Sequence, residues 1–163
     1  AYLKEGWEKP GSRYHVMKEM FACLHKLEVL SADWPKKVRH YEKVLFGGGR
    51  KQYEALHQYR MPDKIAEQLL SYFIYVYFAG AVYDGMPYSK VKLAVISTML
   101  IEDMVCAKAA EKGQLSFEAI ADAAHSYARE VEHSDLNLQR LSIMFRHQKC
   151  FHIGRLCGAL LEW

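Results

Sequence analysis

The chain has few cysteines, and no spacing pattern joins them. Its 163 residues contain four, and none belongs to a C-x-x-C pair; they are Cys23, Cys106, Cys150 and Cys157. Because such pairs are typical of zinc sites and redox-active dithiols, the sequence predicts neither, and we expect no metal site. Cys106 falls within an apolar helical pattern, where a reduced thiol behaves as a small hydrophobic side chain. We expect free thiols in a reducing cytoplasm.

Long apolar segments are also lacking. The longest, residues 69–83, is interrupted by Ser71 and Gly80 and is dense in tyrosine, whereas a transmembrane helix needs about 20 predominantly apolar residues. No segment combines the charged, apolar and small-residue regions of a signal peptide. We therefore expect neither secretion nor membrane insertion, and a cytoplasmic location.

The net charge is small, at +3. Basic residues are enriched in one stretch of the chain, at Lys36, Lys37, Arg39, Lys43, Arg50 and Lys51. We interpret it as a solvated helix face, because no nucleic-acid-binding motif accompanies it, and we expect no nucleic-acid partner. Helix-turn-helix DNA binding is a weaker alternative, since several predicted helices are short but none has a clearly basic recognition face.

Helical periodicity runs through most of the chain. Apolar residues, 51% of the total, recur at three- and four-residue spacing, which predicts amphipathic helices. Gly113 is expected to end one helix, and Ser116 and Ser134 to be N-caps of two others. No period-two run indicates a strand. We predict an all-α fold, a single-domain orthogonal bundle of about six to eight helices over residues 1–163.

The segment 62–84 predicts a strongly aromatic helix. Phe73 and Tyr77 share one of its faces, while Tyr72, Tyr75 and Tyr83 fall on others. A helix that is apolar on several sides is usually buried, so we expect this helix to be central. Its tyrosine hydroxyls would then reach partners at its edges or line a cavity.

Two adjacent carboxylates, Glu102 and Asp103, fall on the apolar side of the helix predicted over residues 89–112. Burying a carboxylate alone costs several kcal/mol, so each is expected to be paired with a cation or to have a raised pKa. Arg129, Arg140 or a histidine from a later helix are candidate partners. A structural ion pair is the first interpretation and a functional acid the second.

The densest polar stretch is residues 127–137, YAREVEHSDLN. Ser134 predicts a new helix, whose first amides, together with Arg129, His133 and Asn137, would suit an anion. Plain helix capping by Ser134 explains the same residues.

Two Glu-x-x-His tetrads raise the alternative of a di-metal carboxylate bundle. They are Glu54–His57 and Glu130–His133, with Glu28 and Glu102 as possible further ligands. Helical geometry argues against it, because Phe117, Ile120, Ala121, Ala124, Tyr127, Ala128 and Val131 predict an apolar stripe from which Glu130 and His133 point away.

Three motifs in order resemble the C-terminal half of the flagellin lysine-N-methylase family. They are residues 127–137, the aromatic segment 70–85 and the segment 89–95, and the resemblance covers roughly residues 62–137. It implies that Arg129, Glu130, Glu132, His133, Ser134 and Asn137 match the family's most recognisable motif. Glu67, and Asp84 within Tyr83-Asp84-Gly85, match the aromatic-helix motif. All of these are candidate functional residues without assigned chemical roles.

The resemblance also implies a partner domain and cofactors. Full-length members transfer methyl groups from S-adenosylmethionine to flagellin lysines, and carry a cysteine-rich N-terminal part thought to bind an iron–sulfur cluster. This chain resembles only the helical part that follows, and Gly47-Gly-Gly49 lacks the G-x-G-x-x-G spacing of a Rossmann loop. We expect the C-terminal domain of a longer protein, which contributes a substrate- or cofactor-facing surface without containing a complete active site. A stand-alone helical binding module is the alternative.

Overall fold

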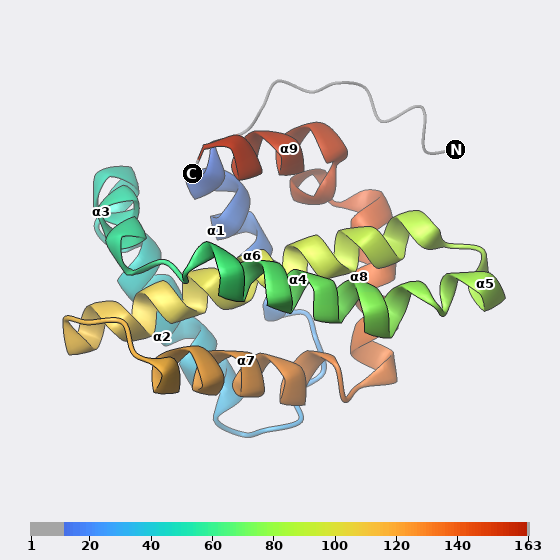
Figure 1. The fold of residues 1–163 in the computed structure, drawn as a ribbon, viewed down its shortest axis with the longest axis horizontal. Helices are drawn as coiled ribbons and strands as arrows, with labels where there is room; N and C mark the ends of the chain where they lie inside the picture. Colours follow the sequence, from blue (N-terminus) through green and yellow to red (C-terminus); the bar gives the residue numbers. More distant parts are fainter. Residues whose placement is uncertain (1–11, 163) are drawn as a thin grey trace.

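The computed structural model describes residues 12–162, which form nine α-helices and two 3₁₀ turns without a strand (Figure 1). The elements are α1 (Arg13–Leu24), α2 (Trp34–Phe46), α3 (Gly49–Ala55), η2 (Leu56–Tyr59), α4 (Asp63–Phe78), α5 (Ala81–Asp84), α6 (Pro87–Lys112), α7 (Phe117–Val131), α8 (Asp135–His147), η3 (Lys149–Phe151) and α9 (Ile153–Leu161). The all-α prediction is confirmed. The described helices exceed the six to eight expected, because the aromatic segment breaks near Ala79 and the short α3 and α5 form separately.

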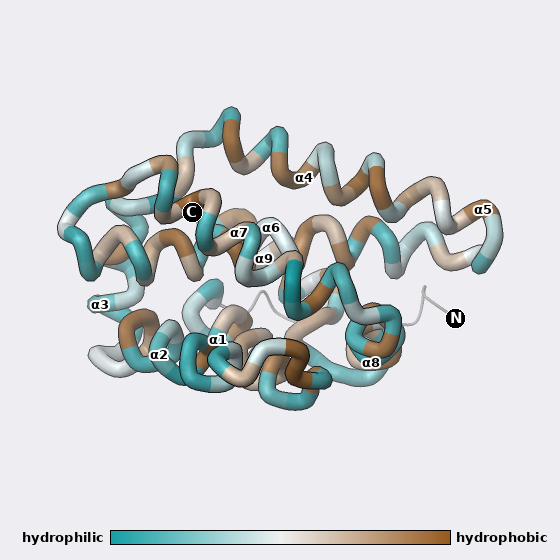
Figure 2. Tube along the Cα trace, turned by 90° about the horizontal axis from the view of Figure 1, so that it is seen from below, coloured by the Kyte–Doolittle hydropathy of each residue, from teal (hydrophilic) through white to brown (hydrophobic). Residues whose placement is uncertain are grey.

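Helix α6 is the centre of the molecule. It is the longest helix, and residues on all its sides are buried, from Ser89 near its start to Ala109 near its end. It contacts α2, α4, α7 and α8. Figure 2 shows α4 and α5 as an outer layer on one side of α6, with α1, α2 and α8 on the other.

Three helix ends lie where capping chemistry predicts them, at Ser116, Ser134 and Gly113. The hydroxyl oxygens of Ser116 and Ser134 accept from the backbone N–H groups of Ala119 and Asn137, at 3.2 and 3.1 Å. Gly113 ends α6 with a φ of +69°, in the left-handed region that glycine adopts without steric cost. These caps confirm the predicted starts of α7 and α8.

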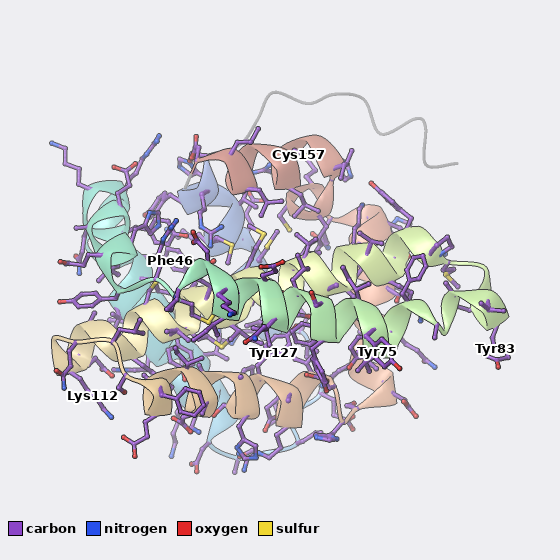
Figure 3. The ribbon with its side chains drawn as sticks, viewed as in Figure 1. Phe46, Tyr75, Tyr83, Lys112, Tyr127 and Cys157 are labelled. Carbon is purple, nitrogen blue, oxygen red and sulfur yellow. The ribbon has the colours of Figure 1, made fainter. Side chains whose placement is uncertain are left out.

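The aromatic helix is not central, which corrects the sequence interpretation. Only Phe73 of α4 is buried, whereas Tyr75 is 86% and Tyr83 92% exposed, and Figure 3 shows Tyr83 at one end of the molecule. The reason is that α4 packs on one side only, mainly against α6. The apolar pattern of α4 therefore reflects an exposed face as well as a buried one.

Among residues 12–162, no helix combines the length and the apolar character that crossing a bilayer would require.

Candidate functional site

The motif 127–137 forms a junction between α7, α8 and the loop that joins α1 to α2. Glu130 is buried, with 1% of its surface exposed, and its Oε2 accepts from the backbone N–H groups of Leu30 at 3.0 Å and Ser31 at 3.2 Å. Arg129 donates to the hydroxyl of Ser31 at 2.9 Å. The α1–α2 loop is thus held against the end of α7.

Asn137 holds the same loop from the first turn of α8. Its Oδ1 accepts from the N–H of Glu28 at 2.7 Å, and its amide nitrogen donates to the carbonyl oxygens of Glu28 and Glu130 at 2.9 and 2.7 Å. Ser134 donates to the Glu28 carboxylate at 3.1 Å. A carboxylate of the chain itself therefore lies at this helix start, which supports the capping interpretation over an anion site.

Glu132 joins the junction to α4. Its Oε2 accepts from the hydroxyls of Tyr72 at 3.2 Å and Tyr77 at 3.1 Å. Burial and this nearby carboxylate raise the pKa of Tyr77, so its hydroxyl stays protonated and donates. Five of the six motif residues therefore connect elements that are far apart in sequence.

The predicted orientation of the motif was wrong for Glu130 and right for His133, which is exposed. The buried face of α7 consists of Ala119, Ile120, Ala123, Ser126, Tyr127, Glu130 and Val131, whereas Phe117 is 78% exposed. The face is rotated because the α1–α2 loop covers the Glu130 side. Within residues 12–162, no three His, Cys, Asp or Glu side chains gather as metal ligands would.

Glu102 and Asp103 pair with a cation that the sequence interpretation did not consider. The Nη2 atom of Arg13 lies 3.0 Å from Asp103 Oδ1 and 3.6 Å from Glu102 Oε2. Tyr53 donates to the other oxygen of Asp103 at 2.8 Å. Arg129 and Arg140, the expected partners, lie instead at the α1–α2 loop, where Arg140 donates to the carbonyl of Lys26.

A signal for Arg13 does exist in the sequence. Arg13 precedes Met17, Met20 and Leu24 at helical spacing, so it falls on the apolar face of α1, where a cation needs a buried acid. Tyr53 and Glu28 have no comparable signal, because their partners lie 50 and 109 residues away.

Glu102 also opens into a groove of about 350 Å³ between α4, α6 and α9. Its side chain is 12% exposed, and Glu67, another sequence candidate, lines the same groove. Burial raises the pKa of Glu102 to about 7, partly opposed by Arg13. The groove therefore combines apolar walls with a carboxylate that changes its charge near neutral pH.

Asp84 lies apart from this groove. It lines a different cavity, between the start of α6 and α8, and its carboxylate pairs with Lys90 at 2.7 Å. Hydrogen bonding to Lys90 lowers the pKa of Asp84. The ten candidate residues from the sequence thus form four groups. Six lie in the motif 127–137, Glu67 and Glu102 line the groove, Asp103 pairs with Arg13, and Asp84 lies by itself.

Replacing Glu102 by glutamine is expected to change how stability depends on pH. A carboxyl whose folded pKa is about 7 stabilises the fold below its unfolded pKa of about 4.3 and loses that contribution as pH rises through 7. We expect the variant to gain about 3 kcal/mol in free energy of unfolding, relative to the native chain, as the pH is raised from 4 to 8. Urea unfolding at pH 4 and pH 8 measures the free energy of unfolding of both proteins. The same difference between the variant and the native chain at both pH values would contradict the raised pKa of Glu102.

Comparison with known proteins identifies a family. The family model described as the FliB lysine N-methylase C-terminal domain matches residues 3–159. No curated protein and no solved structure matched. Since the family model covers nearly the whole chain, this protein belongs to the family of FliB lysine N-methylase C-terminal domains.

Proposed function

We propose that this chain is the helical C-terminal part of an S-adenosylmethionine-dependent protein-lysine methylase, and that it supplies substrate-facing surface. Flagellin, or another protein with accessible lysines, would be the methyl acceptor. The observation that carries this proposal is the groove between α4, α6 and α9, which combines apolar walls with the partly buried carboxylate of Glu102. Such a site suits a cationic side chain with an aliphatic stem.

The iron–sulfur cluster implied by the family resemblance does not fit the described residues. The four cysteines lie on α1, α6, η3 and α9, and three of them are buried. Four thiolates normally hold such a cluster together, and among residues 12–162 no such group of ligands exists. We therefore assign the cluster to a cysteine-rich N-terminal part, the expected partner of this domain.

We assign S-adenosylmethionine binding to this domain acting together with the cysteine-rich N-terminal part. The three glycines 47–49 end α2 and begin α3, and no strand of the described part leads into them as a Rossmann loop requires. We expect the cofactor to need surface from both parts of the methylase.

Calorimetry with S-adenosylmethionine tests whether cofactor binding needs the N-terminal part as well as this domain. Residues 1–163 are compared with the longest protein that the surrounding reading frame encodes. We expect binding by the longer protein and none by the shorter chain. Binding of equal strength by the chain alone would overturn the supporting role.

A stand-alone helical interaction module is the second candidate. The exposed aromatic surface of α4 and α5 favours it, since Tyr75, Val82 and Tyr83 are each at least 85% exposed and large apolar patches mark interaction sites. Absence of cofactor binding by both proteins in the calorimetric comparison would favour this module over the methylase domain.

A further inference from the structure

The groove between α4, α6 and α9 has aliphatic walls on all three helices. Its apolar lining consists of Ala66, Leu70, Val95, Met99 and Leu160. Its volume of about 350 Å³ falls within the range of small-ligand sites, about 300–1,000 Å³. A side chain with an aliphatic stem would therefore bury apolar surface in it.

The polar lining of the groove has an excess of carboxylates. Asp63, Glu67 and Glu102 lie there with one cation, Arg60, which Asp63 already binds at 2.9 Å. Arg13, behind Glu102, is bound more closely by Asp103, at 3.0 Å against 3.6 Å. The balance of charge favours a cationic ligand.

We propose that this groove binds the acceptor lysine of the protein substrate, with its methylene stem between Leu70, Val95 and Met99 and its ammonium group at Glu102. The inference rests on the proposed methylase function and assigns that function's substrate to particular residues. Lysine matches both features of the groove, because its stem packs on apolar surface while its charge requires a partner.

Glu102 also has the chemistry to accept a proton from the bound ammonium. One N–H bond of the lysine Nζ breaks, the proton forms an O–H bond with the Glu102 carboxylate, and the amine keeps its lone pair. A methyl acceptor must have this free lone pair. A pKa near 7 lets Glu102 exchange the proton under neutral conditions. Its charged surroundings are Arg13, Asp103, Arg60, Asp63 and Glu67.

An NMR titration of residues 1–163 tests the assignment. The probes are N-acetyl-lysine-N-methylamide and its norleucine analogue, which has a similar stem without the ammonium group. We expect shifts at the methyl groups of Leu70, Val95, Met99 and Leu160, and at least tenfold tighter binding of the lysine compound. Equal binding of both probes, or shifts confined to other surfaces, would overturn the assignment.

Variants separate binding from folding. Glu102→Gln is expected to weaken lysine binding about tenfold, whereas Glu118→Gln, at a carboxylate of α7 that is 89% exposed, leaves it unchanged. Leu160→Lys changes a residue that is 42% exposed and should weaken binding by adding positive charge at the groove. Native-like spectra for both groove variants with undiminished affinity would contradict the proposal.

The pH dependence gives a third readout. Because Glu102 becomes ionised as pH rises through about 7 while lysine remains charged, we expect lysine binding to strengthen about tenfold between pH 6 and pH 8. The Glu102→Gln variant should lack this change. An identical pH profile in both proteins would exclude Glu102 as the partner.

Two further results distinguish failure of the lysine assignment from failure of the proposed methylase function. S-adenosylmethionine, which also carries cationic groups, is titrated as a competitor, and displacement of the lysine probe from the groove would assign the groove to the cofactor instead. Lysine methylation by the longer protein, without any lysine binding at the groove, would overturn this inference and leave the proposed function intact.

Discussion

Replacement of Asn137 by alanine is expected to lower the free energy of unfolding by about 3 kcal/mol, since each buried polar group left without a partner costs about 1–3 kcal/mol. The Asn137 side chain is fully buried and satisfies the N–H and carbonyl of Glu28 and the carbonyl of Glu130. Alanine would leave all three groups without these bonds and release the α1–α2 loop from α8.

Urea unfolding followed by circular dichroism measures this loss. Gln139→Ala is the matched control, because Gln139 lies on the same helix but is exposed, and it should change stability by less than about 0.5 kcal/mol. Equal effects of the two substitutions would contradict the structural role of the junction. Proteolysis of the Asn137→Ala variant is expected to begin in the α1–α2 loop.

The second large effect is expected for Arg13→Met, at about 3–5 kcal/mol, since removing one partner of a buried ion pair leaves the other charge uncompensated. Arg13 and Asp103 are both 1% exposed. Methionine keeps much of the apolar volume of arginine, so the loss reflects the charge of Asp103 rather than a cavity.

A second substitution tests this explanation. Combining Arg13→Met with Asp103→Asn removes the isolated charge and keeps an acceptor for Tyr53, so we expect the double variant to recover about 2 kcal/mol. The control is Arg50→Met, whose exposed pair with Glu54 should contribute little to stability, because surface ion pairs are solvated and screened. A double variant no more stable than the single one would place the loss in packing.

Helix boundaries were the most predictable part of the fold because local chemistry determines them. Ser116, Ser134 and Gly113 cap their helices through contacts within a few residues, so the sequence alone located these ends.

The position of the aromatic helix was not predictable in this way. An apolar pattern around α4 indicates burial or an exposed interaction surface equally well, and only tertiary packing decides between them. The central position falls to α6, which is buried on all its sides.

The sequence indicated which residues belong to the candidate sites, but it did not indicate what those residues contact. The motif 127–137 stood out by its density of ionisable groups, but Glu130 and Asn137 hold a loop that lies about 100 residues earlier. Glu67 and Glu102 were found separately, and the packing of α4 on α6 brings them to one groove. Because this proximity depends on how α4 packs against α6, no local sequence pattern indicates that Glu67 and Glu102 share a groove.

The central claim is that this domain holds the acceptor lysine, and methylation by the longest protein encoded by the reading frame tests it most directly. Methyl-lysine on flagellin is measured by mass spectrometry for the native protein, Glu102→Gln and Glu118→Gln. We predict that Glu102→Gln lowers kcat/KM at least tenfold while S-adenosylmethionine binding is unchanged, and that Glu118→Gln behaves as the native protein. Methylation by Glu102→Gln at the native rate would contradict the claim.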